Sequence, residues 1–438
     1  MSEKLIIEKF GPIKRLEIDL AKVLILIGPQ SSGKSTIAKL VSIFRDFSFV
    51  VGSLSFTEAL RKYGIDSYLD KNTSIEYKTK EYHFLYEKQN AQIIPIKGEK
   101  LALALKSVDA FNPKTPKKVS SMFKKSNLYQ KNDQVETMIN FITNRFKILD
   151  KRLIVLEDQK QKKILDTKEL ERIKKEMHSF EELINKLENI TDYSVYIPAE
   201  RLFISMIADS IISLFNNSIP LPKVILEFGA SFEKARKNIS SYEVDFLDIS
   251  YKRIKNEDRI YLNKRKHIQL SNASSGLQSL IPLLLVIQDN LNDTSKENTY
   301  VIEEPELNLY PKAQYELAKI ISSICSESTS EYKKNNKIVI TTHSPYILTA
   351  FNNFLLANKL SDKINQEEIE NILSQKIWVS QEDFNAYYID GKNTAQIFNK
   401  KTGLIVDNHL DDASEVIMED FDNLMDLYSN TLLNGQAN

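Results

Sequence analysis

The segment from Val23 to Ser35 constrains the fold of this 438-residue chain more than any other part of it. Val23 to Ile27 is a continuous apolar run, which is typical of a strand buried on both faces. The run leads directly into a turn that matches the pattern G-x4-G-K-S, and we expect a helix from about Lys34 to Phe44. A buried strand, a glycine-rich turn and a helix in this order predict an α/β domain that binds a nucleotide phosphate at the helix N-terminus.

The residue types of this turn suit a triphosphate and its metal ion. The glycines let the backbone wrap closely and point its N–H groups at the phosphates. Lys34 would bridge the β- and γ-phosphates, and the Ser35 hydroxyl would ligate Mg²⁺. We therefore predict that ATP is contacted by Gly28, Pro29, Gln30, Ser31, Ser32, Gly33, Lys34, Ser35 and Thr36.

Two further apolar strands end in polar side chains. Tyr300 to Glu304 ends in two carboxylates, of which Glu303 would hold the Mg²⁺ shell and Glu304 would polarise the attacking water. His343 follows the second strand, at the end expected to face the same crevice, from which it could sense the γ-phosphate. A lone histidine is more often structural, so this role depends on the crevice being real.

The segment from Asn272 to Gln278 (NASSGLQ) opens a long apolar helix. One interpretation is a helix N-cap followed by a buried helix. The other is that Ser275 and the backbone near Gly276 bind a γ-phosphate at the helix N-terminus. Because Lys34 and its loop already supply one such helix end, the second would serve a nucleotide held by another protomer. This interpretation predicts a homodimer.

The remaining pattern divides the chain into an N-terminal part (1–97), an inserted helical hairpin (98–190) and a C-terminal part (191–438). The N-terminal part shows a strand pair around Gly11-Pro12 and two or three strands in 73–96. The insertion begins with a lysine-rich stretch, 111–131, which is either a solvated loop or a DNA-phosphate contact; two short helical stripes follow. In the C-terminal part we expect a basic hairpin at about 247–270, a helix from Pro311, and a polar region after 345.

Composition narrows the class of protein. Lys plus Arg and Asp plus Glu both total 59, so any DNA binding must depend on local patches. No run of about 18 uncharged apolar residues and no secretory signal is visible, and Cys325 is the only cysteine. These features predict a cytoplasmic protein without disulfides that does not insert into membranes.

Taken in this order, the motifs resemble those of ABC-type ATPases, in the branch of SMC-like and OLD-like ATPases. The resemblance covers 1 to about 97 and 191 to about 390, and includes Ile-Glu-Glu-Pro-Glu (302–306), Thr-His-Ser-Pro (342–345) and Ile-Pro-Ala-Glu-Arg (197–201). It implies an α/β ABC-type head with a mixed sheet and an inserted coiled-coil hairpin. It further implies that Ser275, Gly276 and Gln278 act in trans as the signature motif, that His343 is the switch histidine, and that Asn308 lies near the dimer interface.

Two departures from the family pattern concern the nucleotide site. The usual Q-loop glutamine has no clear counterpart, and Glu200 and Arg201 are the polar candidates there, for a nucleotide-site or interface role. Glu303 also replaces the more common aspartate of the Mg²⁺ site, a change that this branch tolerates.

OLD-like nucleases carry a TOPRIM domain after the ATPase, and this chain lacks a convincing one. Asp420 and Asp422 have the spacing of such a site but fit an acidic helix surface better. The chain therefore resembles a stand-alone ATPase of bacterial anti-phage systems that acts on a separate effector, such as the nuclease partner of the Septu ATPase. The alternatives are a slowly hydrolysing scaffold that sequesters a toxic effector, as in PARIS, a DNA-repair ATPase of the SMC-like type, and, less favoured, a transporter subunit.

Overall fold

Six strands form the central sheet of the computed structural model, in the order β15-β14-β3-β13-β12-β7. The structure describes residues 3–50, 54–96, 193–207, 221–263, 265–293, 297–325, 335–406 and 418–425. Five strands run parallel, and β15 pairs antiparallel with β14. The bounds are β3 Val23–Ile27, β7 Tyr193–Ile197, β12 Asn298–Glu303, β13 Lys337–Thr342, β14 Phe384–Ile389 and β15 Thr394–Gln396. The predicted α/β fold with a mixed sheet is confirmed.

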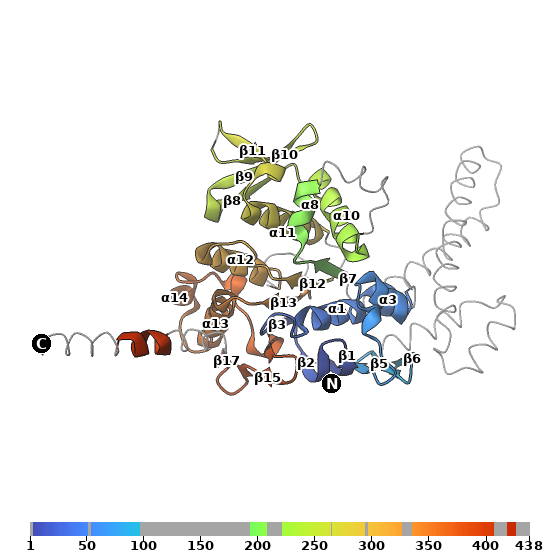
Figure 1. Cartoon of the computed structure of the whole chain (residues 1–438). Helices are drawn as coiled ribbons and strands as arrows, with labels where there is room; N and C mark the ends of the chain where they lie inside the picture. Colours follow the sequence, from blue (N-terminus) through green and yellow to red (C-terminus); the bar gives the residue numbers. More distant parts are fainter. Residues whose placement is uncertain are drawn as a thin grey trace, which may run out of the picture.

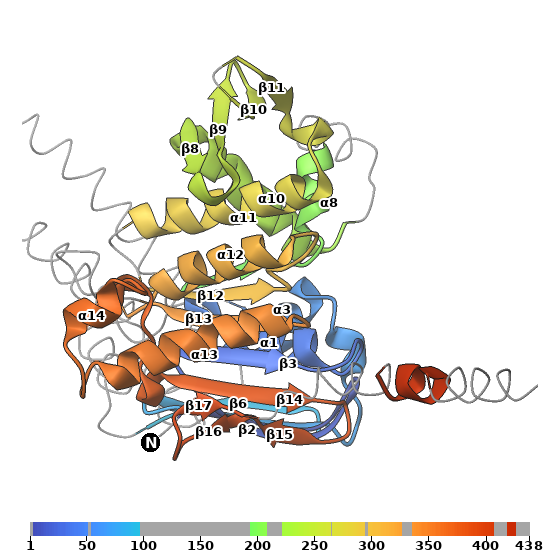
Figure 2. The ribbon, with the colours of Figure 1, turned by 90° about the vertical axis from the view of Figure 1, so that its left-hand side faces the viewer.

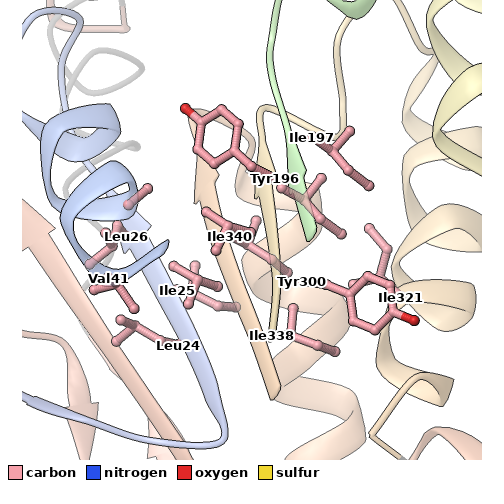
Figure 3. Close-up of a cluster of buried hydrophobic side chains, with 14 of the residues drawn as sticks. Leu24, Ile25, Leu26, Val41, Tyr196, Ile197, Tyr300, Ile321, Ile338 and Ile340 are labelled. Atoms are coloured by element: carbon pink, nitrogen blue, oxygen red, sulfur yellow. The ribbon is translucent and has the colours of Figure 1, made fainter. Parts of the chain in front are cut away.

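Helices cover both faces of this sheet, which explains why its strands read as continuous apolar runs. Alternate residues of β3 point to opposite faces: Leu24 and Leu26 share one face with Val41 of α1 (Lys34–Phe44). On the other face, Ile25 lies in line with Ile340 and Ile338 of β13 and Tyr300 of β12. Ile321 of α12 (Pro311–Ser323) packs on that second face (Figure 3). Helix α13 (Pro345–Leu360) packs beside α12.

An antiparallel five-stranded sheet, in the order β2-β1-β4-β5-β6, flanks the central sheet on the N-terminal side. Its strands are β1 Glu3–Phe10, β2 Ile13–Leu20, β4 Ser74–Lys78, β5 Tyr82–Glu87 and β6 Asn90–Pro95. The expected pair around Gly11 is confirmed by the register Leu5↔Ile18, and the segment 73–96 contains three strands. Phe44 of α1 stacks on Tyr77 of β4 at 4.8 Å between ring centroids, which joins this sheet to the helix. Helices α2 (Phe47–Val50) and α3 (Phe56–Lys62) follow α1.

A second antiparallel sheet, in the order β11-β10-β9-β8, lies at the opposite end of the molecule (Figures 1 and 2). It contains β8 Ser241–Val244, β9 Ile249–Ile254, β10 Glu257–Tyr261 and β11 His267–Gln269. Helices α8 (Arg201–Ile207), α10 (Lys223–Asn238) and α11 (Ser275–Asn292) lie between this sheet and the central one. The prediction of a basic hairpin was incomplete, because the segment belongs to a four-stranded sheet. Buried Asp258 of β10 accepts hydrogen bonds from Arg236 of α10 and Tyr251 of β9, and so ties this sheet to α10.

The prediction of a polar C-terminal region was wrong for residues 384–389. They form β14, a buried strand of the central sheet that pairs with β3. Its polar residue Asn385 is buried, and its amide donates to the Asp19 carbonyl and accepts from Gln396. Further elements are α14 Gln366–Glu370, β16 Phe398–Asn399 and β17 Leu404–Ile405. Residues 418–425 form an exposed helix, which confirms the helix surface predicted for Asp420 and Asp422.

Two predictions concern residues outside the described ranges: the helical hairpin of 98–190 and, within it, the lysine-rich stretch 111–131. Within the part of the chain that the structure describes, no helix has the length and apolar character needed to span a lipid bilayer.

Candidate active site

The carboxyl ends of β3, β12 and β13 meet at one edge of the central sheet, because these strands run parallel and adjacent. Each strand is followed there by one of the motifs predicted from the sequence: Gly28 to Ser35 after β3, Glu304 after β12 and His343 after β13. This is the edge at which α/β sheets bind their ligands. The fold therefore brings the three predicted motifs together.

The loop after β3 holds Lys34 close to its own backbone. The Lys34 amine donates to the carbonyls of Gly28 (2.9 Å) and Pro29 (2.6 Å). Burial lowers the pKa of Lys34 to about 8, although the nearby carboxylates of Glu304, Glu306 and Glu303 oppose this. The rest of the loop divides by exposure: Pro29, Gln30 and Ser31 are exposed, while Gly28, Ser32, Gly33 and Thr36 are buried.

Gly28 is required by a close approach of the C-terminal part of the chain. Its φ is +148°, and a Cβ at this position would lie 1.9 Å from the carbonyl oxygen of Ile389, the last residue of β14. Only glycine combines this backbone conformation with so short an approach. The phosphate-binding loop is therefore packed against a strand that the sequence analysis did not predict.

Glu303 lies on the α1 face of the sheet and suits a divalent cation. The residue is 4% exposed, and its Oε1 atom is buried without a hydrogen-bond partner. Burial raises the pKa of Glu303, opposed by the charge of Lys39 and by the hydroxyls of Tyr196 and Ser35 beside the carboxylate. An unpartnered carboxylate oxygen next to a serine hydroxyl is the oxygen-rich donor set that Mg²⁺ prefers. Glu303 and Ser35 thus fit the predicted metal role.

Glu304 lies just beyond β12 in a strained conformation, with φ of +41°. Its side chain is 31% exposed at the sheet edge, and Oε1 lies 3.6 Å from Nε2 of His343. Burial and the neighbouring charge of Lys34 lower the pKa of His343, so this imidazole is neutral at pH 7. The site therefore presents an accessible carboxylate beside a neutral histidine.

Glu306 is a site residue whose contacts the sequence analysis did not predict. Its Oε1 atom accepts from the Thr342 hydroxyl and from the His343 backbone N–H, both at 2.7 Å. Its Oε2 atom is buried without a partner, and burial raises the pKa of the carboxyl. Glu306 thus fixes the start of the His343 loop. The only sequence signal for it was its place in the Ile-Glu-Glu-Pro-Glu phrase.

The predicted signature residues lie on the first turn of α11, and their contacts are with residues other than those of the phosphate-binding loop. Ser275 is exposed, while Gly276 is buried against Asn308 and Leu309. The Gln278 amide donates to the Ser271 carbonyl at 2.7 Å, so its side chain braces its own turn. Of the three predicted signature residues, Ser275 is the one exposed to an external ligand.

A phosphate-binding loop on a buried strand, with two acids and a histidine at the neighbouring strand ends, defines a P-loop ATPase. The chain belongs to the AAA ATPase domain family, whose sequence profile matches residues 1–348. A search of curated proteins found no match.

Among solved structures, the chain is similar to the Smc head domain with an extended coiled coil from Pyrococcus furiosus, with 11% identity, a TM-score of 0.34 and coverage of 95% of this chain and 98% of that one. It is also similar to the SMC head domain from Thermotoga maritima, with 11% identity, a TM-score of 0.34 and coverage of 91% and 98%. For the recombination mediator RecF the identity is 9%, the TM-score 0.32 and the coverage 90% and 98%.

Proposed function

We propose that this ATPase hydrolyses ATP as a homodimer closed around two nucleotides, and that the closed state controls a separate effector protein. In each site, one protomer supplies the phosphate-binding loop and Glu304, and its partner supplies Ser275 at the N-terminus of α11. The observation that carries the proposal is the accessible Glu304 carboxylate next to neutral His343, at the sheet edge that also holds Lys34.

Each residue of the site has a definite task in this reaction. Lys34 binds the terminal phosphates, and its positive charge offsets the charge that develops there. The half-buried Glu304 carboxylate accepts a proton from the attacking water, and His343 orients that water or the γ-phosphate through its single N–H. Ser35 and Glu303 would hold Mg²⁺, which neutralises phosphate charge when bound.

The surface around the site supports the dimer. Tyr310, which caps the start of α12, is 80% exposed, and Tyr346, the second residue of α13, is 49% exposed; both helices follow a site loop. The two helix starts are adjacent, since Gln314 of α12 accepts from the Ser344 hydroxyl at the start of α13 at 2.5 Å. Exposed aromatic side chains beside an incomplete site are typical of a protein interface.

The effector, its identity as a nuclease and the role in anti-phage defence depend on the resemblance to stand-alone ATPases such as that of Septu. We also propose a cytoplasmic location and a contact with DNA. Among the described residues, no group of three or more His, Cys, Asp or Glu side chains forms a metal cluster.

The test measures particle size by light scattering, with and without ATP, together with phosphate release. Glu304→Gln keeps the shape of the side chain but removes the base, so phosphate release should fall by a factor of about 10²–10⁴. The same variant should accumulate an ATP-bound dimer. Glu316→Gln, which only removes an ion pair with Lys319 on α12, is the matched control and should behave as wild type.

If the particle size of wild type is the same with and without ATP, and its phosphate release is negligible, this proposal is wrong. That result would favour the alternative of a slowly hydrolysing scaffold, in which Glu304→Gln scarcely changes assembly.

A further inference from the structure

Arg201, at the start of α8, is a fully buried cation whose partners are all backbone carbonyls. It is 1% exposed, and burial lowers its pKa to about 10. Its guanidinium donates to the carbonyls of Glu303 (2.7 Å), Glu304 (2.8 Å), Pro305 (3.3 Å), Ser279 (3.2 Å) and Pro198 (3.1 Å). No acidic side chain among the described residues forms an ion pair with it. Burying a charge without a directly bonded counter-ion is costly, even though the carboxylates of Glu306, Glu304 and Glu303 lie near enough to favour the charged form. The five carbonyl bonds give this cation a geometric role.

On one side, Arg201 holds the strained backbone of Glu304. This residue has a left-handed φ of +41°, which non-glycine residues rarely adopt. Its N–H donates to the Thr341 carbonyl at 2.8 Å, and its carbonyl accepts from Arg201. Both backbone polar groups of Glu304 are therefore bonded. Its carbonyl also accepts from the Leu307 N–H at 3.1 Å, and Arg201 adds the side-chain bond that ties this carbonyl to α8.

On the other side, Arg201 donates a hydrogen bond to α11 about one turn before Pro282. Pro282 has no N–H, so the Gln278 carbonyl four residues earlier loses its helical partner. The Ser205 hydroxyl of α8 donates to that Gln278 carbonyl at 2.5 Å, and Arg201 donates to the next one, Ser279. Two consecutive carbonyls of α11, those of Gln278 and Ser279, are thus bonded by side chains of α8.

The first turn of α11 also touches the loop after Glu304 directly. A Cβ on Gly276 would lie 2.7 Å from the carbonyl oxygen of Asn308, so this approach is as close as glycine allows. The turn that carries Ser275 is therefore linked to the Glu304 loop at two points, the Gly276 contact and the Arg201 bridge. A shift of this helix end cannot leave the Glu304 backbone unchanged, since close-packed contacts transmit displacement.

We propose that Arg201 is a positioning residue that couples the two nucleotide sites of the dimer. When Ser275 engages the nucleotide of the partner, the change at the first turn of α11 passes through Ser279 and Arg201 to Glu304 of the same chain. This inference rests on the proposed composite site. Since coupling of binding sites is reciprocal, it implies that ATP at one site favours the reactive arrangement at the other.

The experiment measures phosphate release against ATP concentration for wild type, Arg201→Lys and Ser205→Ala. A lysine amine cannot bridge Ser279 to the Glu304 backbone, because it lacks the planar fork of donors. Wild type should give a Hill coefficient near 2. Arg201→Lys should give a Hill coefficient of about 1 and a maximal rate lower by roughly 10- to 100-fold, with nucleotide affinity of the monomer unchanged.

Ser205→Ala is the matched control, because it removes a bond between α8 and α11 that does not reach Glu304. It should keep the sigmoidal curve. If both variants lose the sigmoidal curve equally, Arg201 only fastens α8 to α11 and the coupling proposal is wrong. Should Arg201→Lys fail to fold, Arg201→Gln takes its place, because it removes both the buried charge and the planar fork of donors; it should lower the Hill coefficient toward 1, and an unchanged coefficient refutes the coupling.

Failure of the composite site gives a different result. A wild type that shows no ATP-dependent dimer and a hyperbolic rate curve overturns both proposals. A wild type that dimerises and is sigmoidal, with an equally sigmoidal Arg201→Lys variant, overturns the coupling alone.

Discussion

Replacing Gly28 by alanine should destabilise the whole head, because the new methyl group meets backbone. The Cβ would start 1.9 Å from the Ile389 carbonyl oxygen, and real Cβ contacts do not fall below 3.0 Å, so β14 or the loop must move by about 1 Å. Overpacking of this kind costs about 1–3 kcal/mol, and forcing alanine to a φ of +148° adds about 1–3 kcal/mol. We therefore expect a loss of about 2–6 kcal/mol in the free energy of unfolding, which is a large part of a typical total.

Gly64→Ala provides the matched control. Gly64 also has a positive φ, +66°, but a Cβ there has no heavy atom within 4 Å. Only the backbone strain remains, which costs about 1–2 kcal/mol. The difference between the two variants therefore comes mainly from the contact with Ile389.

The assay is denaturant unfolding followed by the fluorescence of Trp378, the only tryptophan of the chain. Gly28→Ala should lower the midpoint clearly more than Gly64→Ala. Equal midpoints for the two variants would refute the reasoning, because they would mean that β14 does not press on the phosphate-binding loop in solution.

Three further predictions concern the site. Burial lowers the pKa of Lys34 to about 8, and phosphate binding needs the charged amine. ATP affinity, measured by equilibrium binding, should therefore be constant below pH 8 and fall about tenfold per pH unit above it. The variant Lys34→Arg stays charged and should remove this pH dependence. Glu303→Gln should raise the Mg²⁺ concentration for half-maximal phosphate release by roughly 10- to 100-fold, and an unchanged Mg²⁺ dependence would contradict its metal role. Tyr310→Asp should abolish the ATP-dependent dimer in light scattering without lowering stability by more than about 0.5 kcal/mol. Ile372→Asp, at an equally exposed position just after α14, should leave the dimer intact.

The sequence predicted the strands and helices whose apolar pattern is uninterrupted. Val23 to Ile27 and the helix after it have the predicted bounds, because a strand buried on both faces leaves no polar position to interrupt the pattern. Strand β14 was missed because Asn385 and its tyrosines interrupt that pattern. Their polar groups are satisfied by β2 and β15, and no local sequence signal reports such long-range partners.

The same limit applied to the candidate site. Lys34, Glu304 and His343 were predicted because each stands in a motif at the end of an apolar strand. Arg201 was recognised only as a polar candidate, since its partners are carbonyl oxygens, which every residue type carries. A role that depends on backbone groups of distant segments leaves no pattern in the side chains.

The position of β3 in the sheet has a consequence for how the chain is made. Val23 pairs with Ile338 on one side and with Phe384 on the other, so both neighbours of this early strand are synthesised hundreds of residues after it. Until they leave the ribosome, β3 has two unpaired edges and a fully apolar surface, a combination that favours aggregation. The nascent head thus needs protection during most of its translation, and a fragment that ends with the family match at residue 348 would leave one edge of β3 permanently open.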